Sequence, residues 1–122
     1  NRLFGIDINR ARVMEAKGNI RNAGFQKFIQ MEAHDLRTFK PSFKPTMMIA
    51  NPPYGKRLED EKTLVPLYRA IGDFFKSQAP AKGFVLTGSM PLSKEVGLKA
   101  DKRNVITHGG LDARFLEFDI YK

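Results

Sequence analysis

The chain has 122 residues, of which 42% are hydrophobic and none is cysteine, so one domain with a modest core is expected. The absence of cysteine excludes disulfides and the common structural zinc sites, and no apolar run or leader pattern indicates a membrane span or a secreted protein. The net charge of +8 favours a polyanionic partner, and a cytoplasmic protein without membrane contacts is the simplest expectation.

The sequence predicts strands that alternate with helices or loops. Most of the segments are separated by glycine, proline or charged residues, which mark turns. We expect, in chain order, a strand over 3–6, a helix over 9–23, a strand over 27–32, a loop over 36–45, a strand over 47–50, a charged and mobile segment over 56–62, a helix over 64–78, a strand over 83–87, a short helix or loop over 91–98, and strands over 104–107 and 113–121.

Capping residues and prolines set several of these boundaries. Asn9 can cap the first helix, and Gly24 suits the left-handed turn that ends it. The helix over 64–78 has apolar residues at helical spacing on one face. We expect Pro66 in the first turn of that helix, because a proline further along would remove a backbone hydrogen bond.

The last two predicted strands form a hairpin. Apolar and polar residues alternate from Phe115 to Ile120, and His108-Gly109-Gly110 supplies the turn. The order of elements predicts an α/β fold with a mostly parallel sheet and a C-terminal antiparallel hairpin at its edge.

The segment Asn51-Pro52-Pro53-Tyr54 directly follows the apolar strand over 47–50, whose two methionines we expect in the core. Two consecutive prolines stop the strand, fix two φ angles and remove two backbone donors. We call Asn51–Tyr54 the ledge; Gly55 after it lets the chain leave in almost any direction. A rigid amide, free carbonyls and an aromatic ring are suited to holding a planar base by its exocyclic amine.

Two acidic residues also follow predicted strands. Asp7 ends the first strand and Asp35 lies just past the second, so with Asn51 three strands carry polar groups at their carboxyl ends. Ligands bind at that edge in open α/β sheets. The alternatives are a helix N-cap for Asp7 and an Asx turn for Asp35. It is the joint spacing with Asn51 that favours a site.

These motifs resemble those of a known family. Gly5-Ile6-Asp7, Ala33-His34-Asp35 and above all Asn51-Pro52-Pro53-Tyr54-Gly55 are similar to successive motifs of class I, S-adenosylmethionine-dependent methyltransferases that modify exocyclic base amines. The C-terminal hairpin resembles that of rRNA guanine-N2 methyltransferases that carry a THUMP RNA-binding domain. The resemblance covers essentially the whole chain and implies a Rossmann-like methyltransferase sheet.

The resemblance implies a role for each matching residue. It places Asp7 on the ribose of S-adenosylmethionine, Asp35 near its adenine, and Asn51 at both the cofactor and the target amine. The Pro52 carbonyl would be the second acceptor for that amine, and Tyr54 would stack on the flipped base.

Four basic residues near the ledge are further candidates. Lys56 and Arg57, with Lys62 and Arg69, could contact RNA phosphates, and a merely solvated segment is the alternative. His34 and His108 are expected to be surface or turn residues, and the chemistry requires no metal.

The sequence also departs from the family pattern. A strand followed by a Gly-rich turn is expected before Leu3, and neither is found in the 122 residues. The chain starts at Asn1, not at methionine. We therefore expect residues 1–122 to be part of a catalytic domain from a longer protein, possessing an upstream region with a THUMP domain. The isolated chain is expected to be inactive and not to bind S-adenosylmethionine measurably.

Three functions remain open at this point. The first is methylation of guanine N2 in rRNA. The second is methylation of adenine N6 in DNA or RNA, since the same ledge can hold either amine. The third is a non-catalytic nucleic-acid-binding α/β module, to which the positive charge and Tyr54 would equally belong.

Overall fold

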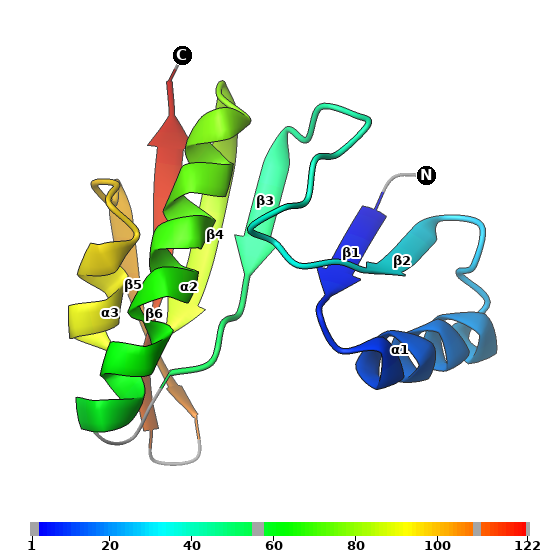
Figure 1. Ribbon diagram of the computed structural model, residues 1–122, viewed down its shortest axis with the longest axis horizontal. Coiled ribbons are helices and arrows are strands. Elements are labelled where there is room, and N and C mark those ends of the chain that lie inside the picture. The colour runs from blue at the N-terminus through cyan, green and yellow to red at the C-terminus, as the bar shows by residue number, and fades with distance from the viewer. Residues whose placement is uncertain (1–2, 55–57, 109–110, 122) are drawn as a thin grey trace. The chain divides into compact units, whose positions relative to one another are not determined.

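The computed structural model describes residues 3–54, 58–108 and 111–121, and the chain divides into two compact units, residues 1–40 and 41–122 (Figure 1). We call these the first and the second unit. The helices and strands are β1 (Leu3–Asp7), α1 (Arg10–Ala23), β2 (Ile29–Ala33), β3 (Met47–Ala50), α2 (Leu58–Ser77), β4 (Ala81–Thr87), α3 (Met90–Glu95), β5 (Lys102–His108) and β6 (Leu111–Ile120).

The first unit is a β-α-β element. Strands β1 and β2 pair in parallel, with Asp7 opposite Ala33 at their carboxyl ends, and α1 connects them. The side chain of Asn9 caps α1 by accepting from the backbone amides of its first turn, and Gly24 ends the helix at a φ of 81°. Both caps are confirmed. Val13 on α1 is buried among the described residues of this unit.

Strand β2 begins at Ile29, two residues later than the sequence analysis expects. The chain makes a turn before it, in which the Phe28 amide donates to the Phe25 carbonyl at 2.9 Å. Phe28 therefore lies outside the strand, and its side chain is 52% exposed.

The second unit is a four-stranded sheet with two helices. The strand order is β3-β4-β6-β5; β3 and β4 are parallel, and the pairs β4/β6 and β6/β5 are antiparallel. Helix α2, green in Figure 1, lies along one face of this sheet and α3 packs beside it. The buried residues at this interface are Tyr68, Ile71 and Phe75 of α2, Val85 of β4, Leu92 of α3, and Leu116, Phe118 and Ile120 of β6.

Two glycines allow close packing in this unit. A Cβ added at Gly83 of β4 would lie 2.5 Å from the Phe75 ring, and one at Gly72 of α2 would lie 1.7 Å from the Val96 carbonyl oxygen. Neither distance is possible for real atoms, so a side chain at either position would force the helix away from its partner.

The opposite face of the sheet has its own contacts. The rings of Phe84 and Phe115 stack with centroids 5.2 Å apart. Lys82 lies 3.5 Å from a Glu117 oxygen and 3.6 Å from an Asp119 oxygen, and Glu117 first, then Asp119, raises the pKa of Lys82. The alternation expected for residues 115–120 is confirmed.

The α/β class and the C-terminal antiparallel hairpin are confirmed, and the strands are divided between a parallel two-stranded sheet and a mixed four-stranded one. His108 and Leu111 are paired at the end of the hairpin. The two glycines of the expected turn, Gly109 and Gly110, lie outside the described residues.

The expected start of the longer helix is wrong. Helix α2 begins at Leu58, so most of the charged segment is helical, and Pro66 lies inside the helix and not in its first turn. The proline ring cannot donate to the Lys62 carbonyl, but both residues are exposed, so water can take that place. The turn before the proline is held instead by Glu61, whose carboxylate accepts from the Ser89 hydroxyl at 2.6 Å.

The expectation for the two methionines of β3 is half wrong. Met48 is 7% exposed and belongs to the core, but Met47 is 57% exposed. Successive side chains of a strand point to opposite faces. Only the face of β3 that carries Met48 is covered.

Candidate functional site

The ledge follows a strand at the carboxyl edge of a parallel pair. Ala50, the last residue of β3, pairs with Val85 of β4, and β4 ends two residues later at Thr87. Asn51 therefore lies at the carboxyl edge of this parallel pair. Ligands of open α/β sheets bind at that edge.

Buried hydroxyl groups hold the ledge from behind. The Tyr68 hydroxyl lies 2.9 Å from the Pro53 carbonyl oxygen and 2.8 Å from Thr87 Oγ1. Both Tyr68 and Thr87 are 0% exposed. Burial raises the pKa of Tyr68, so the phenol keeps its proton at neutral pH and can donate it to the carbonyl.

The ring of Tyr54 lies against the backbone of Gly88. A Cβ added at Gly88 would approach Cε2 of that ring to 2.5 Å. Tyr54 is half-buried, so part of its ring remains accessible. A residue larger than glycine at this position would displace the ring.

The two groups assigned to the target amine have no partner among the described residues. Asn51 is exposed, and the structure gives no hydrogen bond to its side-chain amide or to the Pro52 carbonyl in the described part of the chain. The Pro53 carbonyl, in contrast, already accepts from Tyr68. Of the two proline carbonyls, that of Pro52 is the one without a partner among the described residues, and Pro52 itself is buried.

Asp7 is exposed at the end of β1. Its Oδ1 accepts from the Asn9 amide at 2.8 Å, while Asn9 itself caps α1. The N-cap alternative for Asp7 is therefore wrong, because Asn9 occupies that position. Oδ2 has no hydrogen bond among the described residues, so the carboxylate can still accept from ribose hydroxyls.

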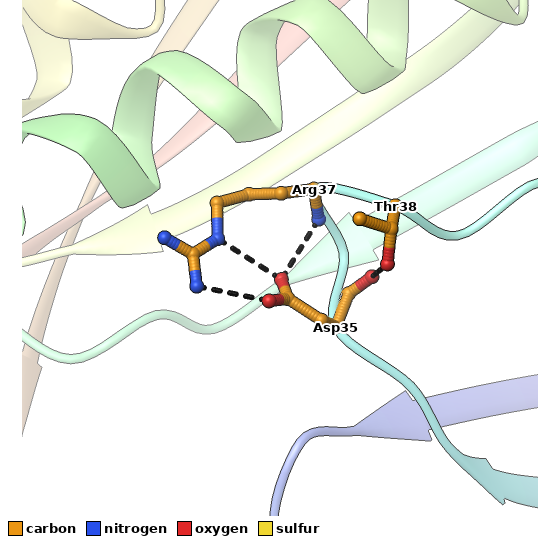
Figure 2. A network of polar contacts seen from close by, with 3 residues as sticks. All are labelled: Asp35, Arg37 and Thr38. Carbon is orange, nitrogen blue, oxygen red and sulfur yellow. Dashed lines mark hydrogen bonds and ion pairs between the residues drawn. The ribbon is translucent and has the colours of Figure 1, made fainter.

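Asp35 is held by the residues that follow it (Figure 2). Its Oδ1 accepts from the Arg37 amide at 3.0 Å and from Arg37 Nε at 3.1 Å, and its Oδ2 lies 2.9 Å from a terminal nitrogen of the same guanidinium. The bond to the amide is the Asx turn that was the alternative interpretation. These hydrogen bonds, first from the side chain and then from the backbone, lower the pKa of Asp35.

The Asp35 carboxylate still has acceptor capacity. Two carboxylate oxygens offer about four lone-pair positions, and Arg37 uses three of them. One position on Oδ2 remains for an amino group such as that of adenine. The contact with adenine stays a prediction.

Within the first unit, Asp7 is the last residue of β1 and Asp35 lies two residues past the end of the neighbouring strand β2. The His34 amide donates to the Asp7 carbonyl at 3.1 Å, and Asp35 is the next residue. The His34 ring lies 2.7 Å from Glu32 and packs on Phe39 with centroids 4.7 Å apart, so His34 has a structural role. His34 and then Gln30 lower the pKa of Glu32 by hydrogen bonding.

The basic candidates are only partly described. Lys56 and Arg57 lie outside the described residues. Lys62 is exposed on α2, and Arg69 pairs with Glu95 at 3.3 Å. An RNA contact by these residues stays a prediction.

The hydroxyl groups behind the ledge are not predicted from the sequence. Tyr68 lies within the helix expected over 64–78, where the helical spacing indicates an apolar face and says nothing of a hydroxyl. A buried tyrosine needs a partner for its O–H, and this requirement was the available signal. Its partners could not be identified, because Pro53 and Thr87 lie 15 and 19 residues away in sequence.

Neither a metal-binding cluster nor a membrane-spanning helix is found in the described part of the chain. No three His, Cys, Asp or Glu side chains are grouped so that they could hold a metal ion in this part of the chain. None of the helices described is long and apolar enough to cross a membrane.

The fold is that of Rossmann-like class I methyltransferases, and solved structures of that class superimpose on most of the chain. The protein SMU.472, whose crystal structure contains S-adenosylhomocysteine, matches with a TM-score of 0.88 and 29% identity over 98% of this chain and 32% of its own. A Listeria monocytogenes protein described as a predicted N6-adenine-specific DNA methylase matches with a TM-score of 0.79 and 29% identity, over 94% of this chain and 29% of its own.

The sequence identifies the family. Residues 1–112 match the RMKL-like, methyltransferase domain family, and the chain belongs to it. Ribosomal RNA large subunit methyltransferase K/L from Hahella chejuensis is 36% identical over 123 residues, which cover 98% of this chain. The chain spans only 17% of the length of that relative.

Proposed function

We propose that this chain is part of the catalytic domain of an S-adenosylmethionine-dependent RNA methyltransferase. The substrate proposed is an exocyclic base amine, guanine N2 of large-subunit rRNA. The relatives that support this assignment are named as methyltransferases of that RNA. The single observation that carries the chemistry is the ledge, with Asn51 exposed and the Pro53 carbonyl already bound by Tyr68.

The ledge can activate an amine by position alone. The lone pair of an exocyclic amine is delocalised into the base. Asn51 Oδ1 and the Pro52 carbonyl can each accept one N–H, which favours tetrahedral nitrogen and directs the lone pair away from the ring plane. Tyr54 would hold the flipped base by stacking. Orientation of this kind supplies much of the acceleration in such transfers.

The first unit carries the residues proposed for the cofactor. When bound, S-adenosylmethionine supplies a methyl group that its sulfonium charge has activated. Asp7 has a free carboxylate oxygen for ribose hydroxyls, and Asp35 keeps one acceptor position for the adenine amine. Both carboxylates therefore fit the donors of an adenosine.

The rest of the protein is also part of the proposal. A chain that spans 17% of a relative's length is consistent with further domains, and a THUMP domain upstream would bind RNA. The net charge of +8 supports a nucleic-acid partner. An rRNA substrate implies a cytoplasmic location.

A second candidate is adenine-N6 methylation. The match to the Listeria monocytogenes protein supports it, since that protein is described as an adenine-specific methylase. An Asn-Pro-Pro-Tyr ledge offers the same two acceptors to either amine. The product nucleoside distinguishes the two reactions.

The experiment replaces Asn51 with alanine in the full-length protein. Tritiated methyl transfer is measured from S-adenosylmethionine to large-subunit rRNA from cells that lack the gene. Loss of one of two acceptors should lower transfer by about 100-fold, because removing a single positioned hydrogen-bonding group in other active sites has an effect of this order. Affinity for the RNA should change little.

The matched control is Asn104→Ala, which removes an exposed asparagine from β5 at the opposite edge of the same sheet. Transfer by this variant should equal that of the wild type. Unchanged transfer by Asn51→Ala would contradict the proposal and favour a non-catalytic RNA-binding module. Mass spectrometry of the digested product separates N2-methylguanosine from N6-methyladenosine.

A further inference from the structure

The buried hydroxyl of Tyr68 lies behind the ledge and belongs to none of the groups that would touch the substrate. Resting on the function proposed above, we propose that Tyr68 is a positioning residue for methyl transfer. It acts by holding the Pro53 carbonyl, and Thr87 orients the hydrogen of its hydroxyl.

Chemistry determines the direction of every hydrogen bond in this group. The Pro53 carbonyl can only accept, so the Tyr68 hydroxyl donates to it. Tyr68 has no second hydrogen, so Thr87 Oγ1 must be the donor across the 2.8 Å contact between them. Thr87 Oγ1 in turn accepts from the Ser89 amide at 3.2 Å. The result is a single chain of donors from Ser89 to the ledge.

Because this chain of hydrogen bonds is buried, it favours one orientation of the Pro53 carbonyl. Tyr68 and Thr87 are both 0% exposed, and a buried hydroxyl without a partner destabilises the folded state. The described residues contain no buried side-chain nitrogen or oxygen that lacks a partner. A different orientation of the Pro53 carbonyl would leave the Tyr68 hydroxyl without its acceptor, so one orientation of the ledge is favoured.

The Pro53 carbonyl is well placed to transmit this constraint. Its oxygen lies in the planar peptide group that joins Pro53 to Tyr54, so holding the oxygen also holds the Tyr54 nitrogen and Cα in that plane. On the other side, the Tyr54 ring rests on Gly88, the residue after Thr87. Both contacts act on the stacking ring, and neither uses the Pro52 carbonyl.

A second connection anchors the donor end of the chain. Ser89 Oγ accepts from the Leu92 amide at 3.1 Å as the cap of α3, and it donates to Glu61 of α2 at 2.6 Å. Helix α2 therefore makes two contacts at this end of β4: Tyr68 with Thr87, the last residue of the strand, and Glu61 with Ser89 in the segment that follows. These two contacts join α2 to the end of β4 on either side of the Tyr68 hydroxyl.

The test replaces Tyr68 with phenylalanine in the full-length protein and uses the same tritium assay on rRNA. Because the ring is kept and only the hydroxyl is lost, we expect kcat to fall about tenfold, since small misplacements of reacting groups slow such reactions strongly. The KM values for S-adenosylmethionine and for the RNA should stay within about twofold of the wild type, because neither ligand contacts Tyr68 in this proposal.

Thr87 provides a pair of variants with opposite expectations. Thr87→Val removes the hydroxyl at nearly constant volume and should lower kcat about threefold, because Tyr68 then lacks the donor that orients it. Thr87→Ser keeps the hydroxyl and should restore kcat to within about twofold of the wild type. If only side-chain volume mattered, Thr87→Ser would lower kcat more than Thr87→Val.

The control is Ser93→Ala, which removes a buried hydroxyl that, among the described residues, donates to the Met90 carbonyl of its own helix. Its kcat should not change, and the melting temperatures of both variants are measured beside kcat so that a loss of activity can be separated from a loss of stability. Equal kcat for wild type and Tyr68→Phe, or an equal loss of kcat in Ser93→Ala, would overturn the positioning role alone. A wild-type protein that transfers no methyl group to rRNA would overturn the proposed function, and this inference with it.

Discussion

The two units hold their polar site residues in different ways. In the first unit, Asp7 and Asp35 are oriented by residues two positions away in sequence, through hydrogen bonds at the surface. In the second unit, the ledge is oriented by Tyr68 and Thr87, which are buried and distant in sequence. Local contacts make a site that can adjust to a ligand, whereas buried contacts make one that is already oriented.

The apolar side chains show the same difference. Val13 is the one buried apolar residue in the described part of the first unit, and Leu3, Phe25 and Phe28 are each more than half exposed. In the second unit, by contrast, α2, α3, β4 and β6 all contribute buried residues. We therefore expect amide hydrogens of β4 and β6 to exchange more slowly than those of β1 and β2.

The largest expected effect of a core substitution is in the second unit. Leu116 of β6 is 1% exposed. Leu116→Ala should lower the free energy of unfolding by about 2–5 kcal/mol, because the smaller side chain leaves a cavity. Val13→Ala in α1 removes less buried surface and should lower it by about 1–2 kcal/mol. Urea titration of the full-length variants measures both. Equal losses would show that the two units have equally packed cores.

Alanine substitutions at Gly72 and Gly18 should change the stability of the protein in opposite directions. Gly72→Ala places a methyl group against the Val96 carbonyl and should destabilise the protein by about 1–3 kcal/mol. Gly18 of α1 has no atom within 4 Å of an added Cβ, so Gly18→Ala should stabilise that helix by about 0.5–1 kcal/mol. Hydrogen exchange of the α1 amides and the melting temperature are the measurements. Destabilisation by Gly18→Ala would reveal a contact that α1 makes with another segment.

The smallest effect concerns pH. Burial raises the pKa of Tyr68 above its value in the unfolded chain, so the folded protein binds that proton more tightly. The stability that results is complete below the unfolded pKa, about 10, and is lost as the pH rises through the folded pKa. Unfolding free energies measured from pH 8 upward should therefore fall in the wild type more steeply than in Tyr68→Phe. Parallel curves would contradict the raised pKa.

Much of the fold and part of the site follow from local sequence patterns. The α/β class, the hairpin and the caps at Asn9 and Gly24 are as expected, because each depends on residues close in sequence. The start of α2 and the place of Pro66 are not, because propensity favours ending a helix near proline, whereas Glu61 is held by Ser89, 28 residues away. Tertiary contacts override a local preference there.

The sequence by itself determined where the ledge is. Two prolines after an apolar strand stop that strand whatever the surroundings, because their rings fix φ and remove the amide donors. Only the tertiary structure decided which carbonyl of the ledge has a partner within the protein. Tyr68 binds the Pro53 carbonyl and leaves that of Pro52, and this choice depends on a hydrogen bond between segments 15 residues apart.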